Sequence, residues 1–193
     1  MILPILSYGH STLRQKCNII DFDYPNLYRL IEDMWETLSN ANGCGLAAPQ
    51  IGKPIKLFIV DSKSTYEGLQ QEDRYHYFSN NDTGIIETFI NAQIIDYSKE
   101  VWEDEEGCLS IPNISQRVIR SRAVTIKYLD SEFKNQVKSF EGVTARMVQH
   151  EYDHTNGILY IDLLNHLTKK IITGKLKKIS KGSLSANYPM IYK

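Results

Sequence analysis

The chain has 193 residues, of which 42% are hydrophobic and 23% charged, and its formal net charge is −1. This size and composition are typical of one soluble globular domain, so we expect residues 1–193 to form a single catalytic domain. The near-neutral charge predicts no general attraction to nucleic acid or lipid, so DNA and membranes are not expected partners.

Cellular location is also constrained by the sequence. Three cysteines, odd in number and widely spaced, argue against a disulfide framework and for a reducing compartment. The apolar run at residues 2–6 is too short for a signal peptide, and no stretch approaches the ~20 apolar residues of a membrane span. We therefore expect a cytoplasmic protein.

The first half of the chain predicts one helix, one strand and a long surface segment. The helix spans Pro25 to Leu38, because proline suits a first turn and apolar residues follow at helical spacing. Asn42-Gly43 ends this pattern. Residues 56–60 are typical of a short buried strand. Residues 62–84 are polar and predict a surface excursion.

The second half predicts strands followed by two helices. The strand-like segments are residues 85–97, 117–120, 123–129 and 136–140. One helix begins at residues 142–144 and ends at Asn156-Gly157, and a second, basic and amphipathic helix covers residues 167–179. Residues 184–193 show no pattern and could form a loose tail. Because helices and strands occur in separate runs, the sequence favours an α+β fold.

The predicted helix at 142–156 carries the most informative motif, Gln149-His150-Glu151-Tyr152-Asp153-His154. Positions four residues apart share one face of a helix, so His150 and His154 can bind one metal ion. Glu151 points away from that face and could reach a water beside the ion. The motif therefore predicts two ligands and a base of a catalytic metal site.

A catalytic zinc-type site has three protein ligands and one open position. Downstream, Asp162 and His166 do not have a recognised spacing. Upstream, Cys108 follows a glycine and could bind a borderline or soft divalent ion as its thiolate. Cys108 could equally be a small buried apolar residue. The sequence thus leaves open an HExxH-type metallopeptidase and a structural metal module.

Three segments together resemble the peptide deformylase family. They are Gly43-Cys44-Gly45-Leu46-Ala47-Ala48-Pro49-Gln50, Glu106-Gly107-Cys108-Leu109-Ser110 and Gln149-His150-Glu151-Tyr152-Asp153-His154. They occur in the family's order, and the likeness extends from residues 2–4 to 157–159. The resemblance implies an α+β fold with antiparallel β-sheets around a central metal-binding helix, flanked by an N-terminal and a C-terminal helix.

The resemblance also implies an activity and a set of residue roles. The expected substrates are nascent polypeptides that begin with N-formylmethionine, from which the enzyme releases formate. The implied metal ligands are Cys108, His150 and His154. Glu151 is the implied acid/base for water bound to the metal, and Gln50 and the backbone N–H of Leu109 are the implied oxyanion donors. The expected ion is Fe²⁺ in cells, with Zn²⁺, Ni²⁺ or Co²⁺ possible in purified protein.

Several further residues are expected to line the substrate cleft. They are Gly43, Cys44, Gly45, Gly107, Arg146 and Met147. The glycines allow backbone to run close beside an extended peptide. Met147 suits an apolar pocket for the substrate methionine. For Arg146 we expect a packed alkyl stem with its charged head in solvent.

The remaining polar residues have simpler interpretations. His10, His76 and His166 are expected at the surface, and Cys17 in packing. Residues 103–106 are expected to form a solvated turn, in which Glu106 could brace an arginine. In the basic helix at 167–181, Leu167, Ile171, Ile172, Leu176 and Ile179 are expected to dock on the body. Its lysines either are simply solvated or contact the ribosome.

Overall fold

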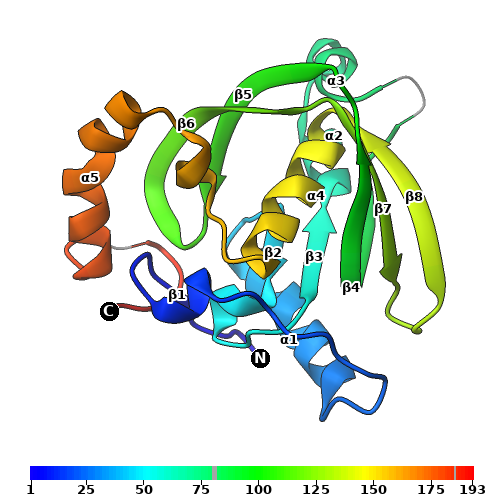
Figure 1. The fold of residues 1–193 in the computed structure, drawn as a ribbon, viewed down its shortest axis with the longest axis horizontal. Coiled ribbons are helices and arrows are strands. Elements are labelled where there is room, and N and C mark those ends of the chain that lie inside the picture. The colour runs from blue at the N-terminus through cyan, green and yellow to red at the C-terminus, as the bar shows by residue number, and fades with distance from the viewer. Residues whose placement is uncertain (80–81, 185) are drawn as a thin grey trace.

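The computed structural model describes residues 1–79, 82–184 and 186–193, and it has the expected α+β architecture (Figure 1). The α-helices are α1 (Leu27–Asn40), α2 (Ser62–Gly68), α3 (Gln71–Tyr77), α4 (Gly142–Thr155) and α5 (His166–Ser180). Short 3-10 helices cover Ser11–Arg14, Ala48–Ile51 and Tyr160–Leu163. The predicted N-terminal, central and C-terminal helices therefore correspond to α1, α4 and α5.

The strands form three separate sheets. An antiparallel five-stranded sheet has the order β2 (Gly45–Ala47), β3 (Leu57–Asp61), β4 (Ile86–Tyr97), β7 (Ala123–Leu129) and β8 (Asn135–Glu141). A second antiparallel pair joins β5 (Val101–Cys108) to β6 (Ile111–Ser121). The short strands β1 (Ile5–Leu6) and β9 (Met190–Ile191) pair in parallel. Figure 1 shows α4 running between the β5–β6 hairpin and the larger sheet.

Burial explains why α4 occupies the centre. Most of its residues are buried, including the polar side chains of Gln149, His150 and Glu151. Its apolar residues Ala145, Met147 and Val148 pack into a core cluster with side chains of the five-stranded sheet. A helix covered on nearly all sides cannot move freely, so its functional side chains are held by the surrounding fold.

The start of α4 also requires a glycine. Gly142 has φ +59°, and a Cβ there would lie 2.3 Å from the carbonyl oxygen of Tyr77. Next to it, the hydroxyls of Ser62 and Thr144 are 2.9 Å apart. The first turn of α4 is thereby fixed against the segment that contains α2 and α3.

One prediction about local structure was wrong. The 62–84 segment is mostly exposed where the structure describes it, as expected, and it contains α2 and α3; residues 80 and 81 lie outside the described part. Residues 103–106 belong to β5 rather than to a solvated turn, and Glu106 is buried. Glutamate and aspartate rarely favour strands, but β5 pairs along its length with β6, which extends well beyond the predicted 117–120.

The described residues of the C-terminal tail are attached to the body. Ile5 pairs with Met190 and Leu6 with Ile191, and the Ile5 N–H donates to the Pro189 carbonyl at 2.9 Å. This parallel pair joins segments far apart in the sequence, and no local pattern in residues 184–193 predicts it.

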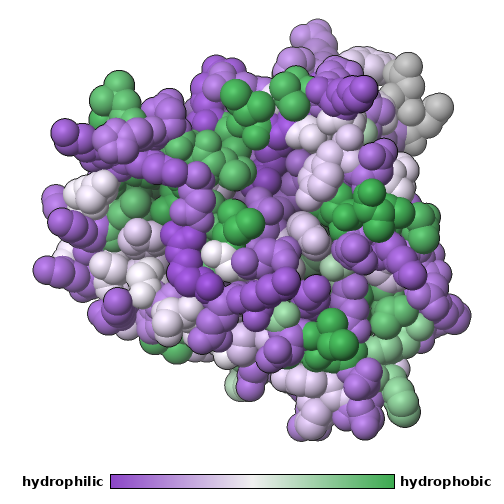
Figure 2. Space-filling view, in the orientation of Figure 1, coloured by the Kyte–Doolittle hydropathy of each residue, from purple (hydrophilic) through white to green (hydrophobic). Residues whose placement is uncertain are grey.

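The surface shows no extended apolar face in the view of Figure 2. Hydrophobic residues there form several separate patches surrounded by hydrophilic ones, one of them over α5 at the left. Among the residues that the structure describes, no helix has the length and apolar character needed to cross a membrane.

Candidate metal centre and active site

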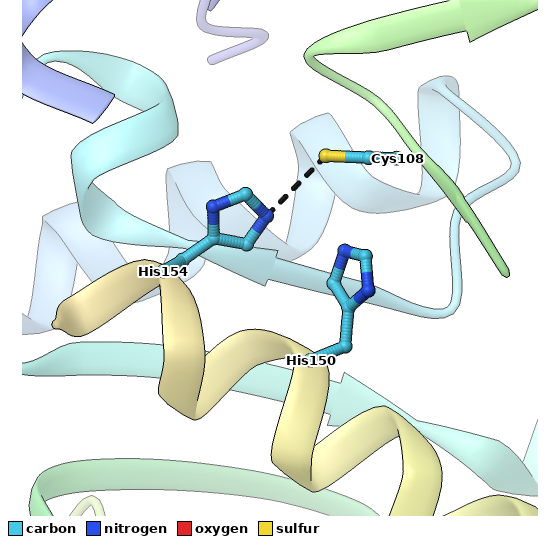
Figure 3. A group of neighbouring side chains, drawn as sticks. All are labelled: Cys108, His150 and His154. Carbon is cyan, nitrogen blue, oxygen red and sulfur yellow. Dashed lines mark hydrogen bonds between the residues drawn. The ribbon is translucent and has the colours of Figure 1, made fainter. Parts of the chain in front are cut away.

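Three potential metal ligands from two distant segments converge beside α4. His150 and His154 project from successive turns of α4, and Cys108 is the last residue of β5 (Figure 3). One ligand atom from each of the three residues lies within 4.8 Å of the other two. The Cys108 Sγ is 3.3 Å from the His154 Nε2. The structure thus brings together the three side chains that the sequence pointed to.

A register shift in the hairpin places the cysteine. Between Glu106 and Cys108 the pairing of β5 with β6 is irregular, and Cys108 then pairs with Ile111 across a tight turn. An extra residue in one strand bends the chain and redirects the following side chains. Gly107 lies at this irregularity and is exposed toward the cleft.

The orientation of His150 is fixed by a buried carboxylate. The His150 Nδ1 lies 3.0 Å from Glu106 Oε2 and donates its proton there, which leaves Nε2 to face the ligand cluster. Burial by itself would raise the pKa of Glu106, but hydrogen bonds from His150 and Arg120 lower it below its usual range. Glu106 therefore stays ionised and holds the imidazole in one tautomer.

Two arginines complete this buried network. Arg120 donates to both oxygens of Glu106, at 2.6 and 2.9 Å, and to Asp153 at 2.7 Å. Arg146 donates to Glu106 Oε1 at 2.6 Å and to the carbonyls of Val118 and Trp102 at 2.9 and 3.0 Å. The expected bracing of an arginine by Glu106 is confirmed.

The prediction for the head group of Arg146 was wrong. Only 3% of this residue is exposed, and its guanidinium lies 4.4 Å from the ring centre of Trp102. The guanidinium is turned inward because one Glu106 carboxylate oxygen and two backbone carbonyls accept its hydrogen bonds and the Trp102 ring offers a stacking face. Arg146 borders the cleft, but its guanidinium is bound by groups of the protein itself.

Glu151 lies next to the ligands in a pocket that only glycine permits. A Cβ on Gly45 would be 2.5 Å from Glu151 Oε1, so a larger residue there would displace the carboxylate. Glu151 is buried, and within the described residues its Oε2 has no hydrogen-bond partner. Burial raises the pKa of this carboxyl to about 7. Such a group can both accept and release a proton near neutral pH.

The amide of Gln50 also points toward the centre. Its Oε1 accepts from the backbone N–H of Ala47 at 2.8 Å, so its Nε2 faces the other way. That Nε2 lies 3.6 Å from Cys108 Sγ and 3.3 Å from Ser110 Oγ. The carbonyl end is occupied by backbone, and the donor end is presented to the site.

A cleft of about 1270 Å³ opens onto these residues. Its lining includes Gly43, Cys44, Gly107, Leu109 and Met147, together with the metal-ligand candidates Cys108 and His150. A Cβ at Gly43 would lie 2.7 Å from Leu38 Cδ1 and 2.9 Å from Leu109 Cδ1, so these two side chains would have to shift. The exposed Cys44 and the largely buried Met147 both border this space.

The residues fit one divalent metal ion. A thiol and two imidazoles are donors of the type that bind zinc and iron. Two buried polar atoms nearby, Glu151 Oε2 and His154 Nδ1, have no partner among the residues that the structure describes. A carboxylate held beside the donors but not among them suits proton transfer at the ion rather than ligation.

An α+β fold that places two histidines, one cysteine and a free carboxylate around one point defines a mononuclear metallohydrolase. Sequence comparison is more specific, since the family model for polypeptide deformylase matches residues 2–170. The chain belongs to the peptide deformylase family, a family of metalloenzymes. The predicted resemblance and the predicted hydrolase activity on N-formylated chains are thereby confirmed, and the metallopeptidase alternative is not supported.

Individual relatives agree along nearly the whole chain. A peptide deformylase of Flavobacterium johnsoniae is 43% identical over 192 residues, covering 98% of this chain and 95% of the relative. One from Christiangramia forsetii is 42% identical with the same coverage. The crystal structure of a Legionella pneumophila peptide deformylase superposes with a TM-score of 0.78 at 32% identity, covering 95% of this chain and 98% of the other.

The sequence did not predict the residues that hydrogen-bond to the site residues and hold them in place. Arg120 lies in the hairpin, where no local pattern marks it as a contact of the centre, and Ser110 stands in a family-like segment but was given no role. Arg120 could be suspected only as a partner for the buried Glu106 once that burial is known. Tyr188, whose hydroxyl donates to the Leu109 carbonyl at 2.8 Å, comes from the tail that showed no pattern.

Proposed function

We propose that Cys108, His150 and His154 hold one divalent ion and that the chain uses it to remove formyl groups from nascent polypeptides beginning with N-formylmethionine. The convergence of the three donors beside Glu151 carries this proposal. When bound, a divalent ion supplies Lewis-acid activation of water toward an amide carbonyl. The C–N bond of the formamide breaks, and formate and a free amine leave.

The protein's own groups supply the rest of the chemistry. Glu151 takes the proton of the attacking water and passes it to the amine nitrogen as the C–N bond breaks. Gln50 Nε2 and the Leu109 N–H donate to the carbonyl oxygen as it becomes negative. Gly43, Cys44, Gly45 and Gly107 border the path of the extended peptide, and Met147 contributes to the pocket for the methionine side chain.

The natural ion in this proposal is Fe²⁺, with Zn²⁺, Ni²⁺ or Co²⁺ as replacements in purified protein. A thiolate and two imidazoles accept all of these ions, so availability and redox conditions decide among them. The test is formate release from a formyl-Met peptide by protein purified without oxygen, with metal content determined on the same sample. Acetyl-Met and unmodified peptides are the controls. Equal cleavage of internal peptide bonds, or no formate at any metal content, would contradict the proposal.

We further infer that the protein acts in the cytoplasm and that α5 contacts the ribosome, where its substrates emerge. Lys170, Lys175, Lys177 and Lys178 are exposed on this helix. Leu167 and Ile171 are 68% and 72% exposed, so the expectation that they dock on the body was wrong, whereas Ile172, Leu176 and Ile179 are buried. A helix that shows lysines and uncovered apolar groups suits a large anionic partner.

Co-sedimentation with ribosomes tests this inference. Replacing the four exposed α5 lysines by alanine should abolish binding, and binding by the unaltered protein should weaken steeply as salt rises. The matched control replaces four lysines that are exposed elsewhere, Lys16, Lys53, Lys99 and Lys127. Equal loss in both variants would indicate a general charge effect and contradict a docking role for α5.

A further inference from the structure

The C-terminal tail reaches the substrate cleft. Ala186, Asn187 and Tyr188 contribute to its lining, although the tail lies beyond residues 2–170 that match the family model. The Tyr188 hydroxyl donates to the Leu109 carbonyl at 2.8 Å. We propose that Tyr188 is a positioning residue for deformylation, which holds the Cys108–Ser110 turn in its working geometry. This inference rests on the function proposed above.

The Cys108–Ser110 turn contributes two groups to the proposed chemistry. Cys108 offers its sulfur from one side of the turn, and the next residue, Leu109, offers its N–H to the developing oxyanion. Only Leu109 and Ser110 separate the end of β5 from the start of β6. A small rotation of either peptide group in so short a turn would move the donor N–H relative to the sulfur.

Three contacts from different parts of the chain hold this turn. Tyr188 binds the Leu109 carbonyl, the Tyr8 N–H donates to the Ser110 carbonyl at 2.8 Å, and Gln50 Nε2 lies 3.3 Å from Ser110 Oγ. The two carbonyls are thus fixed by the N-terminal and C-terminal segments. The hydroxyl contact with Gln50 links the turn to the second proposed oxyanion donor.

Tyr188 is itself held firmly. The neighbouring Pro189 carbonyl accepts from the Ile5 N–H at 2.9 Å, and Met190 then pairs with Ile5 in the β1–β9 ladder. Its ring is partly buried against the same core cluster as Leu109 and Trp35. A donor held by its ring and by the backbone that follows it can impose its geometry on the turn, whereas a mobile one would follow it.

The hydroxyl can be removed without removing the ring. Tyr188→Phe keeps the aromatic wall of the cleft and the packing on Leu109, and it deletes only the hydrogen bond to the turn. Loss of one such bond is worth about a three- to tenfold change in rate when it is needed in the transition state. Because the hydroxyl faces the turn rather than the substrate, KM should change little.

The experiment compares Tyr188→Phe with Tyr192→Phe in the full-length, metal-loaded protein. Tyr192 lies on the same tail, with its ring beside Gly182. We expect kcat per bound metal for a formyl-Met tripeptide at 25 °C to fall about three- to tenfold in Tyr188→Phe, with KM within about twofold. Tyr192→Phe should stay within about twofold of the unaltered protein in both constants.

The outcomes separate this inference from the proposed function. If the unaltered protein releases no formate, the function itself is wrong. If it is active and Tyr188→Phe has the same kcat per bound metal, the hydroxyl is only structural and the inference is overturned. An equal fall of kcat in both tail variants, accompanied by equal losses in melting temperature, would also overturn it.

Discussion

Glu151 stands beside the proposed metal ligands with one oxygen unpartnered among the described residues, an environment that suits the proton-carrier role proposed for it. Glu151→Ala should keep its bound metal and lose nearly all formate release, by about 10²–10⁴-fold, because general acid–base catalysis contributes that much. Metal content and activity should be measured on the same preparation. Near-normal turnover in this variant would show that another group moves the proton.

Cys108, unlike Glu151, should determine whether the protein retains its metal. A serine hydroxyl is a much weaker ligand than a thiolate, so Cys108→Ser should lose bound metal during dialysis against a mild chelator. The matched control is Cys44→Ser, which alters the exposed thiol of the same cleft but none of the three donors. If both variants retain equal metal, Cys108 is not a ligand.

Gly45 gives a steric test of the same site. The Cβ of Gly45→Ala would lie 2.5 Å from Glu151 Oε1, so the carboxylate must shift. A displacement of the proton carrier by about 1 Å can cost on the order of 10²-fold in kcat. Gly68→Ala serves as the control, since a Cβ there meets nothing within 4 Å. The measurement is the steady-state rate of formate release. Full activity in both variants would contradict this expectation.

At the scale of elements, Glu106 joins β5, β6 and α4 through one buried carboxylate. Glu106→Gln would leave the charge of Arg146 buried without its counterion, and Arg120 would keep only Asp153. Breaking a buried ion pair on one side typically costs about 3–5 kcal/mol, so the free energy of unfolding should fall by roughly that amount. Urea unfolding measures it.

The control for that experiment is Glu105→Gln, one residue away on the exposed face of β5. An exposed substitution should change the free energy of unfolding by no more than about 0.5 kcal/mol. Equal small changes in the two variants would mean that the network adds little to stability.

The elements show which features local sequence can reveal. Residues 25–38 and 142–156 were identified as helices because apolar spacing and glycine or asparagine stops are local signals. The hairpin strand β5 was missed because its acidic residues pair with β6 partners that lie 10 to 16 positions away. Glu106 is buried only because arginines from β6 and α4 meet it there, and a local pattern cannot contain that information.

The residues of the candidate site were easier to predict from the sequence than the residues that hold them in place. The proposed ligands His150 and His154 stand in a recognisable motif, since two side chains that bind one ion from a helix lie four residues apart, and Cys108 stands in a segment that resembles the family. Whether the ligand set included Cys108 was open from the residues alone, and the family resemblance favoured it. The contact from Tyr188 depends on the path of the tail, which no periodicity encodes.

At the scale of the whole molecule, α4 contacts both the five-stranded sheet and the β5–β6 hairpin. It packs on the five-stranded sheet through Met147 and Val148, and it is bonded to the β5–β6 hairpin through Arg146 and His150. Neither sheet can lose its structure without exposing this helix. We therefore expect the predicted single domain to unfold as one cooperative unit.

The two tryptophans allow this expectation to be tested. Trp35 lies on α1 and Trp102 on β5, so each reports on a different region. In urea, the fluorescence of Trp35→Phe and of Trp102→Phe should each change at the same midpoint as the far-ultraviolet circular dichroism of that variant. Clearly separated midpoints between the two probes in either variant would indicate more than one unfolding unit.

The glycine at the beginning of α4 makes the active site sensitive to changes made far from it. Because Gly142 abuts the Tyr77 carbonyl and Ser62 bonds Thr144, we expect a shift of residues 62–77 to be transmitted along α4 to the imidazoles about two and three turns further on. Random mutagenesis scored for altered turnover should accordingly yield substitutions in α3 (Gln71–Tyr77), which is not among the elements that line the cleft, as well as around the cleft itself. Inhibitors designed only against the cleft could then lose potency through changes that never touch them.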